Sequence, residues 1–256
     1  MAKGRPGADS TPRVDFEIHG RNIIDLAVDL FGEVPLFWGR YFKSLQHPSD
    51  FEYRRSVESA ILHARGIRVL PTAQQTTHVN RDDRDLARAD ARGNVEDLIK
   101  SFGADYLASQ GDEFLMFLDV EPTHPLHKHY YASWAETVLA RSRELSNDRF
   151  KVIPAVYLNR HDLKTWRAIA NAAAEEGTVC GGLWVASYGN PERPGCTPLI
   201  EWSVEDVQPD NIEMPCEVLI WQYTEECHGG DGFDCNQTSP TIDLDHLLQR
   251  LILPPA

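Results

Sequence analysis

Short apolar runs alternate with helix-patterned segments along most of the chain, and this alternation limits the fold more than any other feature. Strands are expected over 14–18, 34–38, 67–70, 114–120, 152–157, 183–186 and 218–223, with a short eighth strand near Phe233. The runs are mostly continuous in their apolar residues, as in strands covered on both faces. Repeated strand–helix units indicate parallel strands joined by right-handed crossovers. Seven or eight units in 256 residues favour a single irregular (β/α)8 TIM-like barrel.

The segments between the apolar runs carry helix signals. One helix places the apolar residues of 57–64 on one face, with Ser49 or Asp50 as its cap and Gly66 at its end. Further helices are expected over 94–102, 130–145, 162–176 and 243–251. The charged run 81–92 is interpreted as a solvated loop that leads into a helix.

The domain organisation is simple. Residues 1–13 are polar and contain Gly4, Pro6, Gly7 and Pro12, so they are expected to form a disordered lead-in. Residues 14–256 are expected to form the barrel domain. The start of the chain lacks the apolar core of a signal peptide, and no apolar run has the length of a membrane span. We therefore expect synthesis in the cytoplasm and no membrane partner.

The net charge limits the classes of ligand, and the cysteine content limits the possible disulfides and metal sites. The formal net charge is -14, which argues against nucleic acid as a ligand because phosphate binding requires a basic surface. A neutral or mixed-charge ligand, such as a glycan, stays open. The five cysteines lie in the last third of the chain, and reduced thiols are expected. The alternatives are a Cys227–Cys235 disulfide outside the cell and, less favoured, a zinc site that adds His228.

Two carboxylates stand at the end of the most apolar run. Phe114 to Val120 suits a buried parallel strand, and Asp119 and Glu121 lie two positions apart at its C-terminal end. Side chains two apart on a strand point to the same side. The C-terminal ends of barrel strands carry the chemistry in enzymes of this class. Close carboxylates in a partly apolar setting acquire different pKa values, which glycoside hydrolysis requires.

Polar and aromatic residues gather at the other strand ends. Aromatic rings pack on the C–H faces of sugars, while carboxylates and amides take the hydroxyl groups. The alternative for each aromatic residue alone is packing in the core. The candidate substrate-binding residues are Arg40, Tyr41, Gln74, Tyr157, Trp184, Tyr188, Trp221 and Gln222.

Five motifs in order resemble a known family. They are Leu118-Asp119-Val120-Glu121, the run 154–159 (PAVYLN), the run 183–188 (LWVASY), the run 221–224 (WQYT), and Asp234-Cys235-Asn236. In this order they resemble glycoside hydrolase family 25, the barrel lysozymes, and a related group of uncharacterised glycoside-hydrolase-like domains. The resemblance covers roughly the second half of the chain and implies a muramidase barrel.

The resemblance also implies roles by position. Glu121 matches the family's general acid, Asp119 its partner and Asp234 the aspartate after the W-Q-Y-T motif. Asp15 is the candidate for the aspartate of strand one, although Phe16-Glu17 follows it where the family usually has D-V-S. Phe37-Trp38-Gly39-Arg40-Tyr41 replaces the family's strand-two motif and is closer to the uncharacterised relatives.

The resulting hypothesis is a peptidoglycan-cleaving glycosidase. Glu121 would protonate the leaving oxygen, while Asp119 and Asp234 would stabilise the transition state or orient the substrate's 2-acetamido group. The alternatives are a catalytically silent glycan-binding barrel and a glycosidase for another polysaccharide.

Neither a cofactor nor a metal is expected. His124, His127 and His129 follow Glu121 but are interpreted as a loop lining the cleft.

The site of action would be the cell wall, reached after lysis or by non-standard export. If the protein is an injected toxin, an immunity protein would be its partner in the producing cell.

Overall fold

The computed structural model describes residues 2–43, 51–75, 77–188, 196–210, 212–229 and 232–256. The barrel strands are β1 (Pro6–Asp9), β4 (Phe37–Lys43), β5 (Arg68–Gln74), β6 (Glu113–Asp119), β7 (Lys151–Asn159), β8 (Leu183–Ala186), β9 (Val218–Cys227) and β10 (Phe233–Thr238). A separate hairpin consists of β2 (Glu17–Ile18) and β3 (Arg21–Asn22). The helices are α1 (Ile23–Phe31), α2 (Arg55–Arg65), α3 (Arg84–Phe102), α4 (Ala104–Gln110), α5 (Lys128–Ser146), α6 (Leu163–Glu176), α7 (Val204–Val207) and α8 (Leu244–Gln249).

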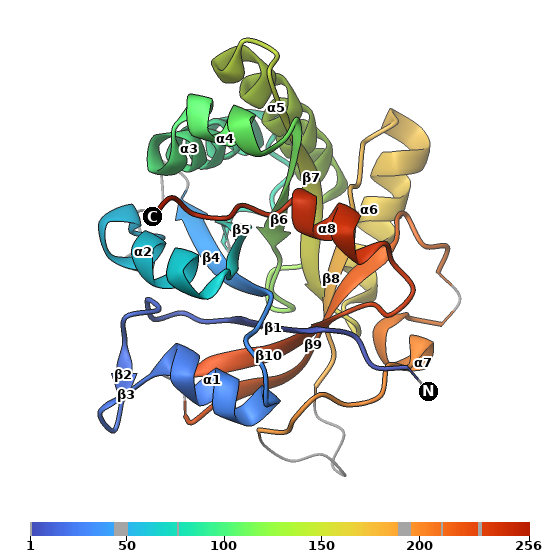
Figure 1. Ribbon diagram of the computed structural model, residues 1–256. Helices are drawn as coiled ribbons and strands as arrows, with labels where there is room; N and C mark the ends of the chain where they lie inside the picture. Colours follow the sequence, from blue (N-terminus) through green and yellow to red (C-terminus); the bar gives the residue numbers. More distant parts are fainter. Residues whose placement is uncertain (1, 44–50, 76, 189–195, 211, 230–231) are drawn as a thin grey trace.

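The strands close into a barrel in the order β1-β10-β9-β8-β7-β6-β5-β4. β10 runs antiparallel to β1 and β9, whereas the other neighbouring pairs are parallel. The helices lie around the barrel (Figure 1). The expected irregular (β/α)8 TIM-like barrel is confirmed, and the antiparallel β10 is its irregularity. Within the described part of the chain, no helix is both long and apolar enough to cross a membrane.

Strand β6 shows why the apolar runs are continuous. Phe114, Met116 and Leu118 pack into the large cluster that includes side chains of α3 and α5. Leu115 and Phe117 belong to the second cluster, which is formed mainly by alternate residues of the barrel strands. Both faces of the strand are therefore buried. Asp119 shares the face of Leu115 and Phe117, so its side chain lies at the mouth of the barrel interior.

The first barrel strand is not where the sequence predicted it. The run 14–18 contributes only the two-residue strand β2, and the true first strand is β1, inside the segment expected to be disordered. This strand was missed because it is built from Pro6, Gly7 and Ala8, which look like a turn. Gly7 has a packing reason, since a Cβ there would lie 2.1 Å from the Phe37 ring.

Two further local expectations need correction. The charged run 81–92 is not a loop: Asp83 caps α3, and the helix begins at Arg84. Its charged residues alternate with Ala87 and Ala91, whose small side chains are buried. The helix over 57–64 is confirmed and ends at Gly66, but Ser49 and Asp50 lie outside the described residues and Arg54 occupies the cap position.

The cysteines also differ from expectation. Cys180 and Cys216 form a disulfide with a Cα–Cα distance of 5.8 Å. Cys227 and Cys235 are buried and unbonded, with their sulfur atoms 3.3 Å apart. The pairing of Cys180 with Cys216 joins segments 36 residues apart, a proximity that the spacing of the cysteines does not reveal.

Candidate active site

A cleft of about 240 Å³ opens at the end of the barrel where the parallel strands finish. Six carboxylates line it, and none of the described lining residues is basic. The lining residues are Asp9, Ser10, Thr11, Tyr41, Thr72, Asp119, Glu121, Tyr157, Trp184, Tyr188, Gln222, Glu225, Glu226, Gly232 and Asp234. A cavity so rich in carboxylates and free of counter-charge favours protonated carboxyl groups.

Asp119 and Glu121 form the centre of the cleft. Asp119 ends β6 and is 4% exposed. Burial raises the pKa of Asp119 well above its usual range, and the charge of Glu121 raises it further. Burial also raises the pKa of Glu121, with the charge of Glu225 as the second cause. A carboxyl group with a raised pKa keeps its proton nearer to neutral pH, as a general acid must.

Gln222 holds two other carboxylates on the opposite side of the barrel. Its Oε1 accepts a hydrogen bond from the Tyr157 hydroxyl at 2.7 Å. Its Nε2 therefore points the other way and donates to Asp234 Oδ2 at 2.8 Å and to Asp9 Oδ1 at 3.1 Å. Asp234 also accepts from the backbone N–H of Glu226 at 2.7 Å. Tyr157 thus fixes the orientation of the amide that joins Asp9 to Asp234.

Asn236 gives Asp9 a second donor. The Trp184 indole donates from Nε1 to Asn236 Oδ1 at 2.7 Å, which turns Asn236 Nδ2 toward Asp9 Oδ1, also at 2.7 Å. Burial nevertheless raises the pKa of Asp9 well above its usual range, with the charge of Asp234 as the second cause. For Asp234, burial with the charges of Glu225, Glu226 and Glu121 raises the pKa to about 7, against the lowering effect of the Glu226 N–H.

The approach of Asp9 and Trp184 at the barrel mouth depends on a glycine in the neighbouring strand. Asp9 pairs with Gly39 across β1 and β4 and with Asp234 across β1 and β10. A Cβ on Gly39 would lie 2.6 Å from Asp9 Cβ and 3.0 Å from Trp184 Cη2. Glycine at this position lets the aspartate and the indole share the barrel mouth.

Most of the predicted site residues meet in this cleft. Asp119, Glu121 and Asp234 line it, together with the predicted binding residues Tyr41, Tyr157, Trp184, Tyr188 and Gln222. Gln74 ends β5 but is not among the lining residues. Trp221 is also not among them: it is buried, donates from Nε1 to Ser187 O at 3.0 Å and packs edge-on against Trp202. Trp221 therefore packs in the core, which was the alternative given for each aromatic residue, and does not bind substrate in the cleft.

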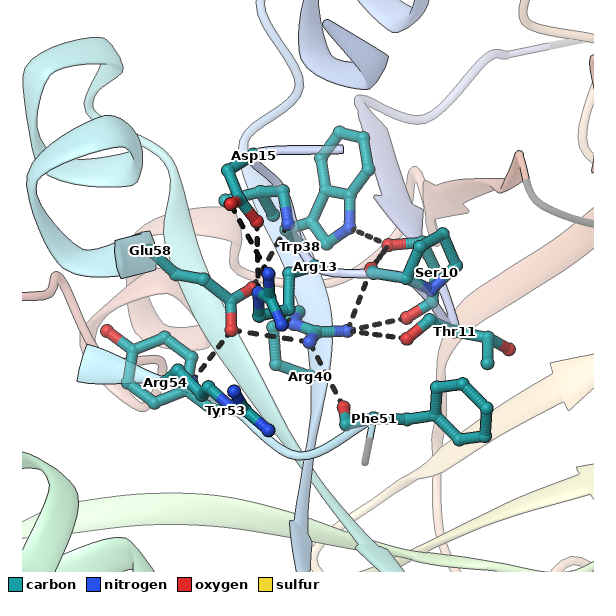
Figure 2. A network of polar contacts seen from close by, with 12 residues as sticks. Ser10, Thr11, Arg13, Asp15, Trp38, Arg40, Phe51, Tyr53, Arg54 and Glu58 are labelled. Carbon is teal, nitrogen blue, oxygen red and sulfur yellow. Dashed lines mark hydrogen bonds and ion pairs between the residues drawn. The ribbon is translucent and has the colours of Figure 1, made fainter. Parts of the chain in front are cut away.

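Arg40 has a different place from the one predicted. Its side chain is fully buried, and Nε lies 2.6 Å from Glu58 Oε2, a carboxylate that is equally buried (Figure 2). The guanidinium donates to Ser10 O at 2.7 Å, Pro12 O at 3.2 Å and Phe51 O at 3.1 Å. Arg40 thus holds the segment after β1 beneath the cleft and does not reach the cleft itself.

Asp15 is likewise not a cleft residue. Its carboxylate pairs with Arg13 Nε at 3.1 Å, and both side chains are 34% exposed (Figure 2). Asp9, at the end of the true first strand, takes the place predicted for Asp15. The sequence signal for Asp9 was weak, because only Gly7-Ala8 precedes it where an apolar strand was sought. Glu225 and Glu226 were also missed, although they directly follow the W-Q-Y-T motif.

Comparisons with known proteins show the fold. No family model matches the chain, and no curated protein matches it in sequence. An uncharacterised B. stearothermophilus protein is similar in structure, with 21% identity, a TM-score of 0.66, and 97% of this chain and 100% of that chain covered. The spore cortex lytic enzyme SleM of Clostridium perfringens has 17% identity and a TM-score of 0.55, with 95% and 69% covered. A muramidase from Trichobolus zukalii has 16% identity and a TM-score of 0.52, with 96% and 98% covered.

Proposed function

We propose that the protein is a glycoside hydrolase that cleaves the glycan strands of peptidoglycan, as a muramidase does. The observation that carries the proposal is the position of Asp119 and Glu121 in one cleft, at the end of β6 and just beyond it, with a raised pKa at both. The barrel likeness to a muramidase and to a spore cortex lytic enzyme supports the same class of substrate.

In this proposal Glu121 is the general acid. Its carboxyl proton passes to the glycosidic oxygen as the bond from that oxygen to the anomeric carbon breaks, and positive charge develops on the sugar. Water then adds to the anomeric carbon and returns a proton to the Glu121 carboxylate. The raised pKa of Glu121 keeps this proton in place when substrate binds. Deprotonation at higher pH removes the acid, so the rate should fall on the alkaline side of the optimum.

Asp119 and the Asp9–Asp234 pair have complementary roles. Among the described residues, no side chain donates a hydrogen bond to the Asp119 carboxyl group, which leaves its oxygens for an N–H or O–H group of the substrate. Such a bond would orient the 2-acetamido group or stabilise the charge that develops on the sugar. Asp234 and Asp9 share the Gln222 amide and place two further carboxyl groups on the other side of the cleft.

The test is cleavage of purified peptidoglycan by the full chain. Loss of turbidity should be accompanied by new reducing ends, and mass analysis after borohydride reduction should find reduced muramic acid. Glu121→Gln is the matched control, because the amide keeps the shape but has no proton to donate. Reduced glucosamine in place of muramic acid would change the bond assigned, and cleavage of a different polysaccharide would change the substrate. Retention on peptidoglycan without any new reducing ends would support the silent glycan-binding barrel.

A further inference from the structure

A second group of polar side chains lies outside the cleft, where α5 begins. His127 caps this helix and His129 lies in its first turn. Both rings face Asp82, which lies 47 positions before His129 in the segment leading to α3. The three residues each offer one ligand atom, and these atoms lie within 4.8 Å of one another. None of the three lines the cleft.

The distances suit a small metal ion. Asp82 Oδ1 lies 3.5 Å from His127 Nδ1 and 2.7 Å from His129 Nδ1. Zinc–nitrogen and zinc–oxygen bonds are about 2.0–2.1 Å long, so the ligand atoms of a tetrahedral site lie roughly 3.3 Å apart. The His127 distance already fits, but Nδ1 would release the cap bond that it accepts from His129 N at 3.4 Å. The His129 ring must move back by about half an ångström. The proton shared between His129 and Asp82 would leave as the ion enters.

The carboxylate of Glu176 lies on the side of the His129 ring that faces away from Asp82. Glu176 Oε1 lies 4.0 Å from His129 Nε2, on the ring atom that would not bind the ion. Arg84 holds Glu176 through both carboxylate oxygens, at 2.9 and 3.1 Å, and is itself placed by Ser133 Oγ at 3.3 Å. A histidine that binds a metal usually donates its other N–H to such a carboxylate, which orients the ring.

The surroundings allow an ion to enter and remain. The side chains of Asp82, His127 and His129 are 63%, 36% and 34% exposed, so water and ions reach them. The positive end of α5 opposes a cation. The charge of Asp82 offsets this effect, and Glu176 adds a second carboxylate beside His129. Imidazole nitrogen with one carboxylate oxygen is a ligand set that Zn²⁺ accepts.

We propose that Asp82, His127 and His129 bind a divalent transition-metal ion of the Zn²⁺ type. Three protein ligands leave the remaining position to water. The ion would link the segment before α3 to the start of α5, which are already joined by the backbone bond from His127 N to Val79 O at 2.8 Å. Since the segment between β6 and α5 begins with Val120 and Glu121, the ion would brace one wall of the cleft without touching it.

The test uses tag-free full chain, freed of metal by chelator and then titrated with ZnCl₂. Calorimetry should show one equivalent bound. The melting temperature should rise by roughly 5–10 °C at a hundredfold excess over the dissociation constant. Co²⁺ in place of Zn²⁺ should give the visible absorption of a tetrahedral site.

Variants separate this site from other histidines. Asp82→Asn and His129→Gln should lower the affinity for Zn²⁺ by about 10²-fold, and Glu176→Gln by about tenfold through the orientation of His129. His124→Gln is the matched control: His124 lies in the same segment, but its ring contacts Thr123. Unchanged affinity in Asp82→Asn and His129→Gln, or an equal loss in His124→Gln, would overturn the proposal. So would the absence of any binding by wild-type protein.

Discussion

The buried carboxylate of Glu58 and the buried carboxylates of the cleft lie near the same end of the barrel, but they differ in what surrounds them. Glu58 is fully buried beside the equally buried Arg40, and its oxygens also accept from Val14 N at 3.2 Å and Arg54 N at 2.8 Å. In the cleft, the carboxyl groups of Asp9, Asp119 and Asp234 line one cavity, and no described lining residue is basic. Glu58 serves the scaffold because its charge is fully matched, whereas the cleft holds charge that only a ligand or a proton can satisfy.

The unmatched carboxylates of the cleft lower the stability of the folded protein. A buried carboxylate with a raised pKa lowers the free energy of unfolding once the pH is high enough to ionise it. Groups held at such a cost are concentrated at functional sites. Glu58 and Arg40 thus belong to the scaffold and the cleft carboxylates to function, and four experiments test this difference.

The largest effect should come from Glu121→Gln. Removing the acidic proton should lower the rate of peptidoglycan hydrolysis by about 10²–10⁴-fold, while glycan binding and the melting temperature stay near wild type. Release of reducing ends measures the rate, and pull-down on insoluble peptidoglycan measures binding. Glu136→Gln, an exposed position on α5, is the control and should keep full activity. Near-normal turnover in Glu121→Gln would remove it from the chemistry.

Glu58→Gln should mainly lower the stability of the fold, whereas Glu121→Gln should mainly lower the rate. It leaves Arg40 buried without its counter-charge, which typically costs about 3–5 kcal/mol in the free energy of unfolding. Urea unfolding measures the loss. The exposed pair of Arg5 and Glu33, 2.7 Å apart, supplies the control: Glu33→Gln should cost less than about 1 kcal/mol. Equal losses in the two variants would show that Arg40 and Glu58 are not a scaffold pair.

Replacing the aspartates of the N-terminal segment tests the corrected strand assignment. Asp9→Asn should lower the hydrolysis rate by about 10²-fold, because it removes one of the two carboxyl groups that share the Gln222 amide. Asp15→Asn should leave the rate unchanged, because its carboxylate pairs with Arg13 outside the cleft. If Asp15→Asn is the inactive variant, Asp15 and not Asp9 belongs to the site.

The fourth effect is a change in the pH dependence of stability. Asp234 has a pKa raised to about 7, so the folded state binds its proton more tightly than the unfolded state does. Its contribution to stability is complete below about pH 4 and is lost as the pH rises through 7. Asparagine does not titrate. Between about pH 4 and pH 8, the stability of Asp234→Asn relative to wild type should therefore rise by about 4 kcal/mol.

Urea unfolding at several pH values across this range measures the relative stability of Asp234→Asn and wild type. Any cost of the substitution that does not depend on pH, such as a weaker bond to Gln222, cancels in this comparison. A constant difference across the range would show that Asp234 titrates normally in the folded protein.

Local patterns predicted the barrel and its centre well. Asp119 ends the regular strand β6, and Glu121, two residues beyond it, lines the same cleft, as the two-residue period of a strand predicted. The same local logic placed Tyr157 near the end of β7 and Gln222 on β9. It failed at β1, because a four-residue strand of Pro, Gly, Ala and Asp carries no apolar signal of its own.

The sequence alone was sufficient to determine the alternation of strands and helices, the covering of strands such as β6 on both faces, and the pair of carboxylates at the end of β6. These follow from periodicity and burial along the chain. Only the tertiary structure brought Asp9 beside Asp234, Arg40 under the segment after β1, and Asp82 to His127 and His129. Each of these contacts joins residues far apart in sequence, and their proximity depends on the closing of the barrel and the packing of helices around it.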